Sequence, residues 1–493
     1  MRLLFIPNFT KGLSSEKMSP NSVITDSGFK ILQDIRNSIG NRAYCYWILP
    51  SQLDGIGMEK VMGDRDHCFY ESQCVDNFYY RDTYVDSELL KKFSRRFGDY
   101  LADAIVTTRR GAVYEMSKLT DTTRLGENSK NKDDVKKINM PIVFIEPNAW
   151  EYDNNFDVVS AMCYYLAYPV FLSDVEKKKA LRITSEYVSG RVLKAIDNRA
   201  RVGFSVFQFE RMDKIKTQSR KSDEFVTIFY GQRMNKYKRT KFIFDIYAKL
   251  FAMYGDKINV VATTQNGLTG ISEQTEEEKW GKFYHLVPNC DWETYIGYAN
   301  MSHVALVASV SEALSSAHIE QIYMGVIMVL PKKDWAMEYV PEDYPFFYNG
   351  ASECLGIMQY IIENYEEAYR KFEPAIDFVK NKFSDPTRTL DAVVTDVVIE
   401  SREALMDEYR SAMNNKRGLL SRALGLKSEI SWADFVRGLE NNSPTISGKQ
   451  SIEFRRMNTI TDYEAYVALQ SIMGCHDTLT HEMPIIINEG EKE

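Results

Sequence analysis

Cysteine and histidine are too few and too scattered in this sequence to form a zinc site or a disulfide framework. The 493 residues include seven Cys and six His, and no two Cys form a C-x-x-C pair. The Cys lie in apolar stretches, which is typical of reduced thiols rather than of a disulfide-stabilised secreted domain. No Cys/His set has the ligand spacing of a zinc site, so we expect no structural metal.

Long apolar runs and an excess of positive charge are also missing. No stretch of 18 apolar residues occurs, which argues against a membrane-spanning helix. The N-terminal MRLLFIPNF is too short for a signal-peptide core and is typical of a first buried strand. We therefore expect a cytoplasmic protein. The net charge of −8 excludes a polybasic nucleic-acid binder, so a polyanion would have to be bound by a local basic patch.

The sequence does contain a regular alternation of short apolar runs and amphipathic stretches. Such alternation is typical of βαβ units in parallel, doubly wound sheets, and the length indicates two or three domains. In the first half the pattern predicts strands at 3–7, 43–49, 104–107, 142–146 and 203–207, with helices at 28–39, 87–101 and 176–198.

A polar stretch at 213–224 has no apolar periodicity and is predicted to link two domains. A second series follows, with strands at 225–230, 258–264, 283–288, 303–310 and 326–330 and helices at 241–254, 292–300 and 316–324. From 352 to 424 the pattern favours long amphipathic helices. The predicted domains are 1–213, 224–385 and a helical extension, 386–493, that packs partly back on the first domain.

The segment 289–331 contains the most informative pattern. A predicted strand ends in a turn of small residues, Glu312 follows, and a helix begins near Ser316. Ligands bind beyond the carboxyl ends of parallel strands, and a helix N-terminus suits a diphosphate. Glu320 lies about two helical turns after Glu312, where a carboxylate can accept both hydroxyls of a ribose, and Gly325 is expected to end the helix. The alternative is that both glutamates are simply solvated.

This arrangement resembles the donor-site signature of GT-B glycosyltransferases, especially retaining ones. The signature is S-x-S-E, seven residues, a second Glu, and then a Gly leading into an apolar strand. The resemblance implies two Rossmann-like domains facing across a cleft, with Glu312 facing the donor sugar and Glu320 binding the nucleotide ribose. The donor-binding set it predicts in this segment also includes Ser311, Leu314, Ser315 and Ser316.

A second match lies upstream, where a predicted strand is followed by Gly231 and the basic loop QRMNKYKRTK. The family has a Gly, an Arg and a Lys in this order to neutralise the donor diphosphate, which implies Arg233 with Lys236 or Lys238. A solvated basic helix face is the alternative. By position only, Leu286 and Val287 are predicted beside the nucleobase. The implied donor is a nucleotide-sugar, with UDP favoured, and no tightly bound metal is required, Mg²⁺ being at most stimulatory.

The chain order of residues 1–345 is loosely similar to that of phage DNA glucosyltransferases. Glu146 ends a predicted strand at the position of their catalytic base and could accept a proton from an acceptor hydroxyl. A capping or salt-bridged carboxylate is the alternative for this residue. The resemblance implies double-stranded DNA with hydroxymethylated pyrimidines as acceptor, and the host cytoplasm as location if the chain is phage-encoded. A surface glycan or protein acceptor, or a non-catalytic nucleotide- or DNA-binding protein of the same fold, remains an alternative.

These hypotheses have consequences for the stereochemistry of the reaction and for the surface that would bind DNA. A base at Glu146 fits an inverting reaction, whereas the Glu312/Glu320 pair fits a retaining one, which we favour while the stereochemistry stays open. A DNA acceptor also needs a basic rim around an extruded base. The candidates for this rim are Arg95, Arg96, Arg109 and Arg110 in the first domain and Lys214, Lys216, Arg220 and Lys221 in the linker.

Overall fold

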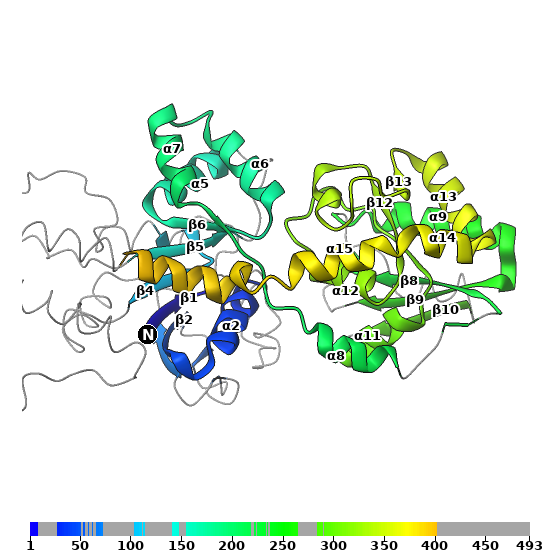
Figure 1. Cartoon of the computed structure of the whole chain (residues 1–493), viewed down its shortest axis with the longest axis horizontal. Helices are drawn as coiled ribbons and strands as arrows, with labels where there is room; N and C mark the ends of the chain where they lie inside the picture. The colour runs from blue at the N-terminus through cyan, green and yellow to red at the C-terminus, as the bar shows by residue number, and fades with distance from the viewer. Residues whose placement is uncertain are drawn as a thin grey trace, which may run out of the picture. The chain divides into compact units, whose positions relative to one another are not determined.

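A computed structural model of the chain shows two parallel β-sheets with helices (Figure 1). The first sheet lies in the first half of the sequence and the second sheet in the second half. The residues that the structure describes are 1–7, 27–50, 53–54, 58, 62, 66–71, 103–110, 112–113, 141–146, 154–217, 221–222, 224–232, 234, 237–264, 283–288 and 290–401.

The first sheet has seven strands in the order β3-β2-β1-β4-β5-β6-β7. Every strand pair with a described register is parallel. β1, β4 and β5 are apolar and almost wholly buried, as expected for strands covered on both faces. The strands are β1 Arg2–Ile6, β2 Tyr44–Pro50, β3 Asp66–Glu71, β4 Ala104–Thr107, β5 Ile142–Glu146, β6 Tyr168–Phe171 and β7 Arg201–Val202, and the helices α2 Ser27–Ile39, α5 Asn154–Leu166, α6 Asp174–Thr184 and α7 Gly190–Arg199 accompany them.

The second sheet has six parallel strands in the order β10-β9-β8-β11-β12-β13. In Figure 1, α9 and α13 lie on one side of β8, β9 and β10, and α8 and α11 lie on the other. The strands are β8 Val226–Gly231, β9 Ile258–Thr264, β10 Tyr284–Pro288, β11 Val304–Leu306, β12 Ile327–Pro331 and β13 Phe347–Tyr348, and the helices are α8 Phe209–Lys216, α9 Thr240–Tyr254, α11 Trp292–Met301, α12 Ser316–Tyr323, α13 Ala351–Glu363, α14 Tyr365–Phe372 and α15 Pro374–Phe383.

Both sheets share one topology. Numbered from its own first strand, the second sheet runs 3-2-1-4-5-6, the strand order of the doubly wound Rossmann fold, and the first sheet runs in the same order with a seventh strand, β7, after β6. In the second sheet β8 is strand 1, and the chain continues to β9 on one side of it and later returns to β11 on the other. The prediction of an α/β chain with two Rossmann-like sheets is confirmed.

Three predicted elements in the first half differ from the structure. The helix predicted over 176–198 is two helices, α6 and α7, because Ser185–Ser189 forms turns and an extended N-cap between them. The strand predicted over 203–207 is wrong, because β7 ends at Val202 and Phe204 forms a single bridge with Thr389. The helix predicted over 87–101 lies outside the described residues.

The predicted linker, one predicted strand and one predicted helix in the second half also differ from the structure. The first residues of the predicted 213–224 linker belong to α8, which buries Phe209 and Met212. The strand predicted over 303–310 is only the three residues of β11, and the chain beyond it is a loop. The run LGIMQYIIENYEEAYRKF is divided between α13 and α14 at Asn364, whose backbone leaves the helical region.

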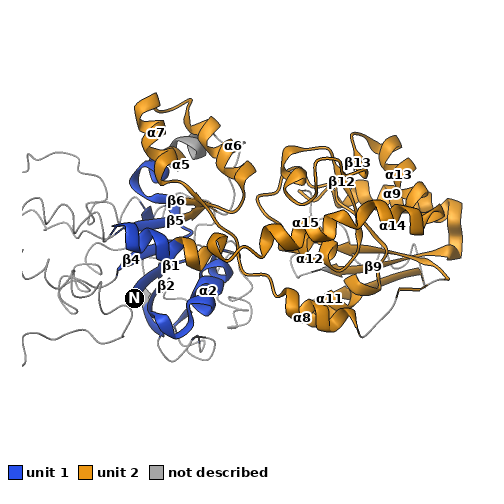
Figure 2. Ribbon diagram, viewed as in Figure 1, with its two compact units in different colours: residues 1–144, 162–168, 394–493 blue, residues 145–161, 169–393 orange. Residues whose placement is uncertain are grey.

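Contacts within the chain divide it into two compact units (Figure 2). One unit comprises residues 1–144, 162–168 and 394–493, and the other comprises 145–161 and 169–393. The predicted boundaries 1–213, 224–385 and 386–493 remain a prediction. None of the helices that the structure describes is both long and apolar enough to cross a membrane.

Candidate nucleotide-sugar site

Several of the predicted donor residues lie on segments that leave the second sheet where its strand order reverses. β8 ends at Gly231 and its parallel neighbour β11 ends at Leu306, so both chains leave the sheet at the same edge. The crevice beside such a topological switch point is where open α/β sheets bind ligands. We call the segment 307–315, between β11 and α12, the donor loop.

The donor loop is anchored from three directions. The Val310 N–H donates to the Tyr237 carbonyl oxygen at 3.1 Å, and the Ser315 N–H donates to the Tyr339 hydroxyl at 2.7 Å. Lys333 donates from its Nζ to the Val310 carbonyl oxygen at 3.0 Å. These contacts hold the loop by its backbone, which leaves the side chains of its middle residues available for other partners.

Glu312 forms an ion pair with Lys238, which lies in the turn before α9. The exposed fractions of the two side chains are 9% and 12%, so the pair is largely withdrawn from water. The pair brings one member of the predicted basic loop onto the first glutamate of the predicted signature. The other two basic candidates, Arg233 and Lys236, lie outside the described residues.

The N-terminus of α12 offers donors for an anion. Ser315 is the N-cap residue in an extended conformation, and its side chain makes no capping hydrogen bond. Among the described residues, no hydrogen-bond partner is found for the backbone N–H groups of Ser316 and Ala317. Unpaired amides at the positive end of a helix favour a phosphate oxygen.

Glu320 lies on α12 and is oriented by an indole. The Trp292 Nε1–H donates to Glu320 Oε1 at 2.8 Å, and Trp292 is the first residue of α11. This hydrogen bond uses one carboxylate oxygen and fixes the rotamer of the side chain. Glu320 is half-buried, so the side chain is only partly exposed to solvent.

Gly231 is packed too closely to carry a side chain. Gln321 donates from its Nε2 to the Gly231 carbonyl oxygen at 3.2 Å and to the Tyr295 hydroxyl at 2.9 Å. A Cβ added at Gly231 would lie 2.6 Å from that Nε2 and 2.5 Å from the Phe229 ring. The glycine therefore allows β8 and α12 to approach each other at the site.

Gly325 ends α12 as predicted, in a left-handed conformation with φ of +82°. The Val326 N–H donates to the Gln321 carbonyl oxygen, and the Gly325 N–H donates to the Ile322 carbonyl oxygen. This pair of hydrogen bonds is a Schellman cap. The cap fixes the length of α12 and thus the place of Glu320 relative to the donor loop.

His318, in the first turn of α12, is a buried neutral base. Its ring is 1% exposed and packs against Trp335 and Tyr339. Burial, with a smaller contribution from the Lys238 charge, lowers the pKa of His318 well below its usual value. The ring is therefore a packing element of the site rather than a proton donor at neutral pH.

The remaining predicted residues are divided between the donor loop, β10 and the first sheet. Ser311 and Leu314 belong to the donor loop, whereas Leu286 and Val287 lie on β10, the outermost strand of the sheet, and are half-buried. Glu146 is the last residue of β5 in the first sheet and is 2% exposed. The roles of all these residues remain predictions.

The predicted basic rim for DNA is wrong at three of its positions. Arg109 and Arg110 are buried, with exposed fractions of 7% and 3%. Lys221 donates to the Gly325 carbonyl oxygen and the Tyr365 hydroxyl instead of facing solvent. Lys216 lies over the Tyr323 ring and is half-buried, so Lys214 is the one described candidate that is exposed. The other three, Arg95, Arg96 and Arg220, lie outside the described residues.

Several partners of the site were not predicted. They are the aromatic residues Trp292, Tyr295 and Tyr339, which lie outside α12. Their hydrogen bonds to the site join residues that are 24 to 28 positions apart in the sequence. No local periodicity marks such contacts. Among the described residues, no group of three or more His, Cys, Asp or Glu side chains is placed to hold a metal ion.

Comparison with known proteins supports the fold. No protein-family profile and no curated sequence matches this chain. Solved structures do match, and the three named below cover 81–82% of this chain over 99% of their own chains. They include Anabaena HepE in complex with UDP-glucose (13% identity, TM-score 0.51), sucrose-phosphate synthase from Thermosynechococcus elongatus (12%, 0.55) and an E. coli trehalose-6-phosphate protein bound with UDP-2-fluoro glucose (11%, 0.53). The chain has the GT-B fold.

Proposed function

We propose that this chain is a glycosyltransferase that moves a sugar from a nucleotide-sugar to a hydroxyl acceptor. The observation that carries the proposal is the Lys238–Glu312 ion pair on the donor loop, directly before the N-terminus of α12, the helix that also contains Glu320 and packs against Gly231. Fold alone does not define an activity, so the proposal depends on this site.

The proposed donor is a UDP-sugar. Structures with the same fold contain UDP-glucose and UDP. In this chain, the Ser316 and Ala317 amides would bind the diphosphate, and the Glu320 carboxylate, which Trp292 orients, would accept the ribose hydroxyls. Arg233 and Lys236 are proposed to add positive charge, and Leu286 and Val287 to lie near the nucleobase.

The proposed catalysis is mainly electrostatic. Negative charge accumulates on the diphosphate as the bond to the sugar breaks, and fixed dipoles and cations stabilise it without reorganisation. The α12 N-terminus and Lys238 would supply this stabilisation. Glu312 would orient Lys238 through their ion pair and face the sugar.

Glu146 is proposed as the base that accepts the acceptor proton in an inverting reaction. In a retaining reaction the leaving diphosphate would take that proton, and Glu146 would be dispensable. Proton NMR of the anomeric signal of the first-formed product distinguishes the two outcomes. Glu146→Gln reports on the same question, because only an inverting enzyme should lose most of its turnover.

We further propose that the acceptor is a hydroxymethylated pyrimidine in double-stranded DNA. Its support is the chain order of the first half and the position of Glu146 at the end of β5. The burial of Arg109 and Arg110 removes two phosphate contacts that this acceptor was expected to make. Transfer to hydroxymethylated DNA, unmodified DNA and a panel of sugars and glycans should be compared with one labelled donor.

A donor assay tests the activity itself. Purified chain should be titrated with UDP and GDP by calorimetry and incubated with UDP- and GDP-sugars while nucleotide release is measured. The proposal predicts UDP binding and slow hydrolysis of at least one UDP-sugar. Binding of UDP without any hydrolysis or transfer would indicate a non-catalytic nucleotide-binding protein, and no binding of either nucleotide would refute the donor site.

A further inference from the structure

The helix α6 belongs to the first sheet by sequence, yet it contacts the donor loop. Lys179 of α6 directs its Nζ to the Ser311 hydroxyl at 3.5 Å. Ser311 directly precedes Glu312, the predicted sugar-facing glutamate. Both segments belong to the same compact unit, which Figure 2 shows in one colour.

The Lys179 ammonium has spare donor capacity. Its two described partners are Ser311 Oγ at 3.5 Å and Glu176 Oε1 at 3.7 Å, both longer than an ordinary N–H···O hydrogen bond. An ammonium has three N–H donors, and the side chain is only 15% exposed, so water satisfies it poorly. An oxygen atom of a bound ligand beside Ser311 would supply the missing short contact.

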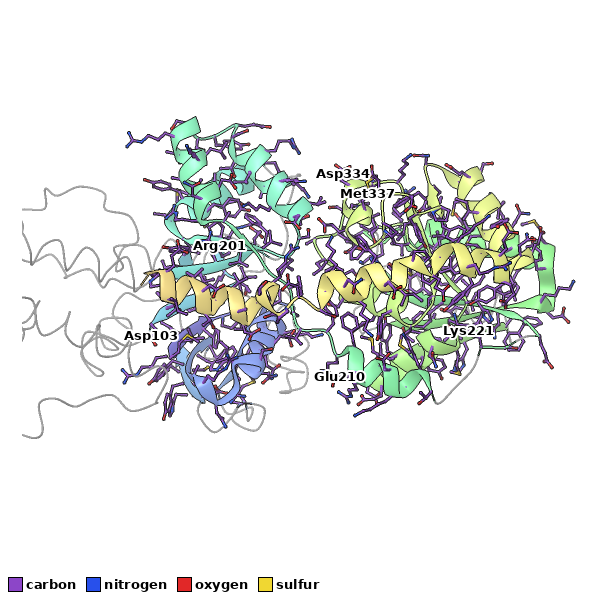
Figure 3. The ribbon with its side chains drawn as sticks, viewed as in Figure 1. Asp103, Arg201, Glu210, Lys221, Asp334 and Met337 are labelled. Atoms are coloured by element: carbon purple, nitrogen blue, oxygen red, sulfur yellow. The ribbon has the colours of Figure 1, made fainter. Side chains whose placement is uncertain are left out.

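Glu338 fixes the place of α6. It lies at the end of the 3-10 turn η6 Asp334–Glu338, in which Figure 3 labels Asp334 and Met337. The Val175 N–H, in the first turn of α6, donates to Glu338 Oε1 at 2.7 Å, and Lys382 pairs with the other carboxylate oxygen. A buried carboxylate at a helix N-terminus is favoured by the helix dipole, so this contact sets where Lys179 reaches the loop.

Charge at the loop favours an anionic ligand. Three lysines from three different segments contact three consecutive residues: Lys333 on Val310, Lys179 on Ser311 and Lys238 on Glu312. Among the described residues, Lys238 pairs with Glu312 and Lys179 with Glu176, so the charge of Lys333 is the one in excess beside Lys179. A phosphate-type oxygen is the group that an under-coordinated ammonium in this position binds most favourably.

We propose that Lys179, positioned by Glu338, is a further ligand-binding residue that takes an anionic phosphate-type oxygen beside Ser311. This inference rests on the proposed function and names a residue from outside the second sheet for the same site. The oxygen can come from the donor diphosphate or from an acidic group on the acceptor.

The test compares Lys179→Met with Lys178→Met. Lys178 is exposed on the same helix and has no hydrogen bond or ion pair with the described residues, which makes it a matched control. Each variant and the wild type are titrated with UDP and a UDP-sugar by calorimetry, and acceptor KM and kcat are measured for transfer. Thermal unfolding checks that both variants are folded.

Loss of a charge-assisted hydrogen bond predicts an effect of about tenfold or more for Lys179→Met. Weaker UDP binding assigns the oxygen to the donor, whereas a higher acceptor KM with unchanged UDP binding assigns it to the acceptor. If Lys179→Met matches Lys178→Met within twofold in every measurement while the wild type binds UDP, the Lys179 assignment is wrong and the proposed function stands. If the wild type binds neither UDP nor a UDP-sugar, both proposals are wrong.

Glu338 is tested through its effect on Lys179. Glu338→Ala should weaken ligand binding in the wild type and add little in the Lys179→Met background, because the two residues act through one contact. Glu338→Gln keeps an oxygen for the Val175 N–H and should restore most of the binding. Equal additional losses in both backgrounds would show that Glu338 does not act through Lys179.

Discussion

The Lys238 ammonium and the Glu312 carboxylate form an ion pair that joins the turn before α9 to the donor loop after β11. Two segments that lie 74 residues apart in sequence are thus fixed together at the carboxyl edge of the second sheet. Since the pair is largely withdrawn from water, its two members depend on each other. A substitution at either position should therefore affect both folding and donor binding.

Lys238→Met should destabilise the protein by about 3 kcal/mol, because it leaves the Glu312 carboxylate buried without its cation. Chemical denaturation of the variant measures this loss. The double variant Lys238→Met with Glu312→Leu should recover much of the stability, since it removes both charges, yet it should still lack turnover. Recovery of turnover in the double variant would show that the pair has only a structural role.

Glu320→Ala should weaken UDP binding about tenfold or more, because the ribose hydroxyls would lose a charged acceptor. Trp292→Phe keeps an aromatic ring but removes the N–H that orients Glu320, and a loss of about threefold is expected from one neutral donor. Calorimetric titration with UDP gives both values. An effect of Trp292→Phe that persists in the Glu320→Ala background would contradict the orienting role.

Gly231→Ala should lower both stability and donor binding, since the new Cβ would contact the Phe229 ring and Gln321 Nε2 at less than normal separation. An overpacking cost of about 1–3 kcal/mol is expected. Gly297→Ala is the matched control, because that glycine lies within α11 and a Cβ there meets nothing within 4 Å. The control should leave UDP binding unchanged and the unfolding midpoint equal or slightly higher. Similar losses in both variants would contradict the packing argument.

Local sequence signals predicted most of the second sheet. β9 agrees with its predicted limits, and Gly325 caps α12 where a glycine was expected to end it. The turn at 309–311 and Glu320 were singled out because a predicted strand, a small-residue turn and a helix follow one another directly in the chain. Signals of this kind depend on residues that are close together in the sequence, so they can be recognised without the structure.

Contacts between distant residues were not predictable in the same way. The capping of α6 by Glu338 joins residues 163 positions apart, and no periodicity in either segment marks it. The break between α13 and α14 was missed because the apolar pattern continues through Asn364. Arg109 and Arg110 were expected on a basic rim because arginine is usually exposed, but tertiary packing buries them after β4.

Lys221 should make the stability of the protein depend on pH. Burial, with a smaller contribution from the Lys216 charge, lowers the pKa of the Lys221 ammonium to about 7. Between pH 7 and the ordinary lysine pKa, the unfolded chain therefore binds a proton that the folded protein does not. The free energy of unfolding should rise with pH in this window, by up to about 1.4 kcal/mol per pH unit, and the full cost of burying the charge should be present below pH 7.

Lys221→Met removes this titration while keeping an unbranched side chain between Gly325 and the Tyr365 ring. Urea denaturation at pH 7, 8 and 9 should give a free energy of unfolding that rises more steeply for the wild type than for the variant. The variant should also be the more stable of the two at pH 7, where the wild type still carries a partly protonated buried amine. Parallel pH profiles for the two proteins would mean that the Lys221 ammonium stays charged in the folded state, stabilised by the Gly325 carbonyl oxygen and the Tyr365 hydroxyl.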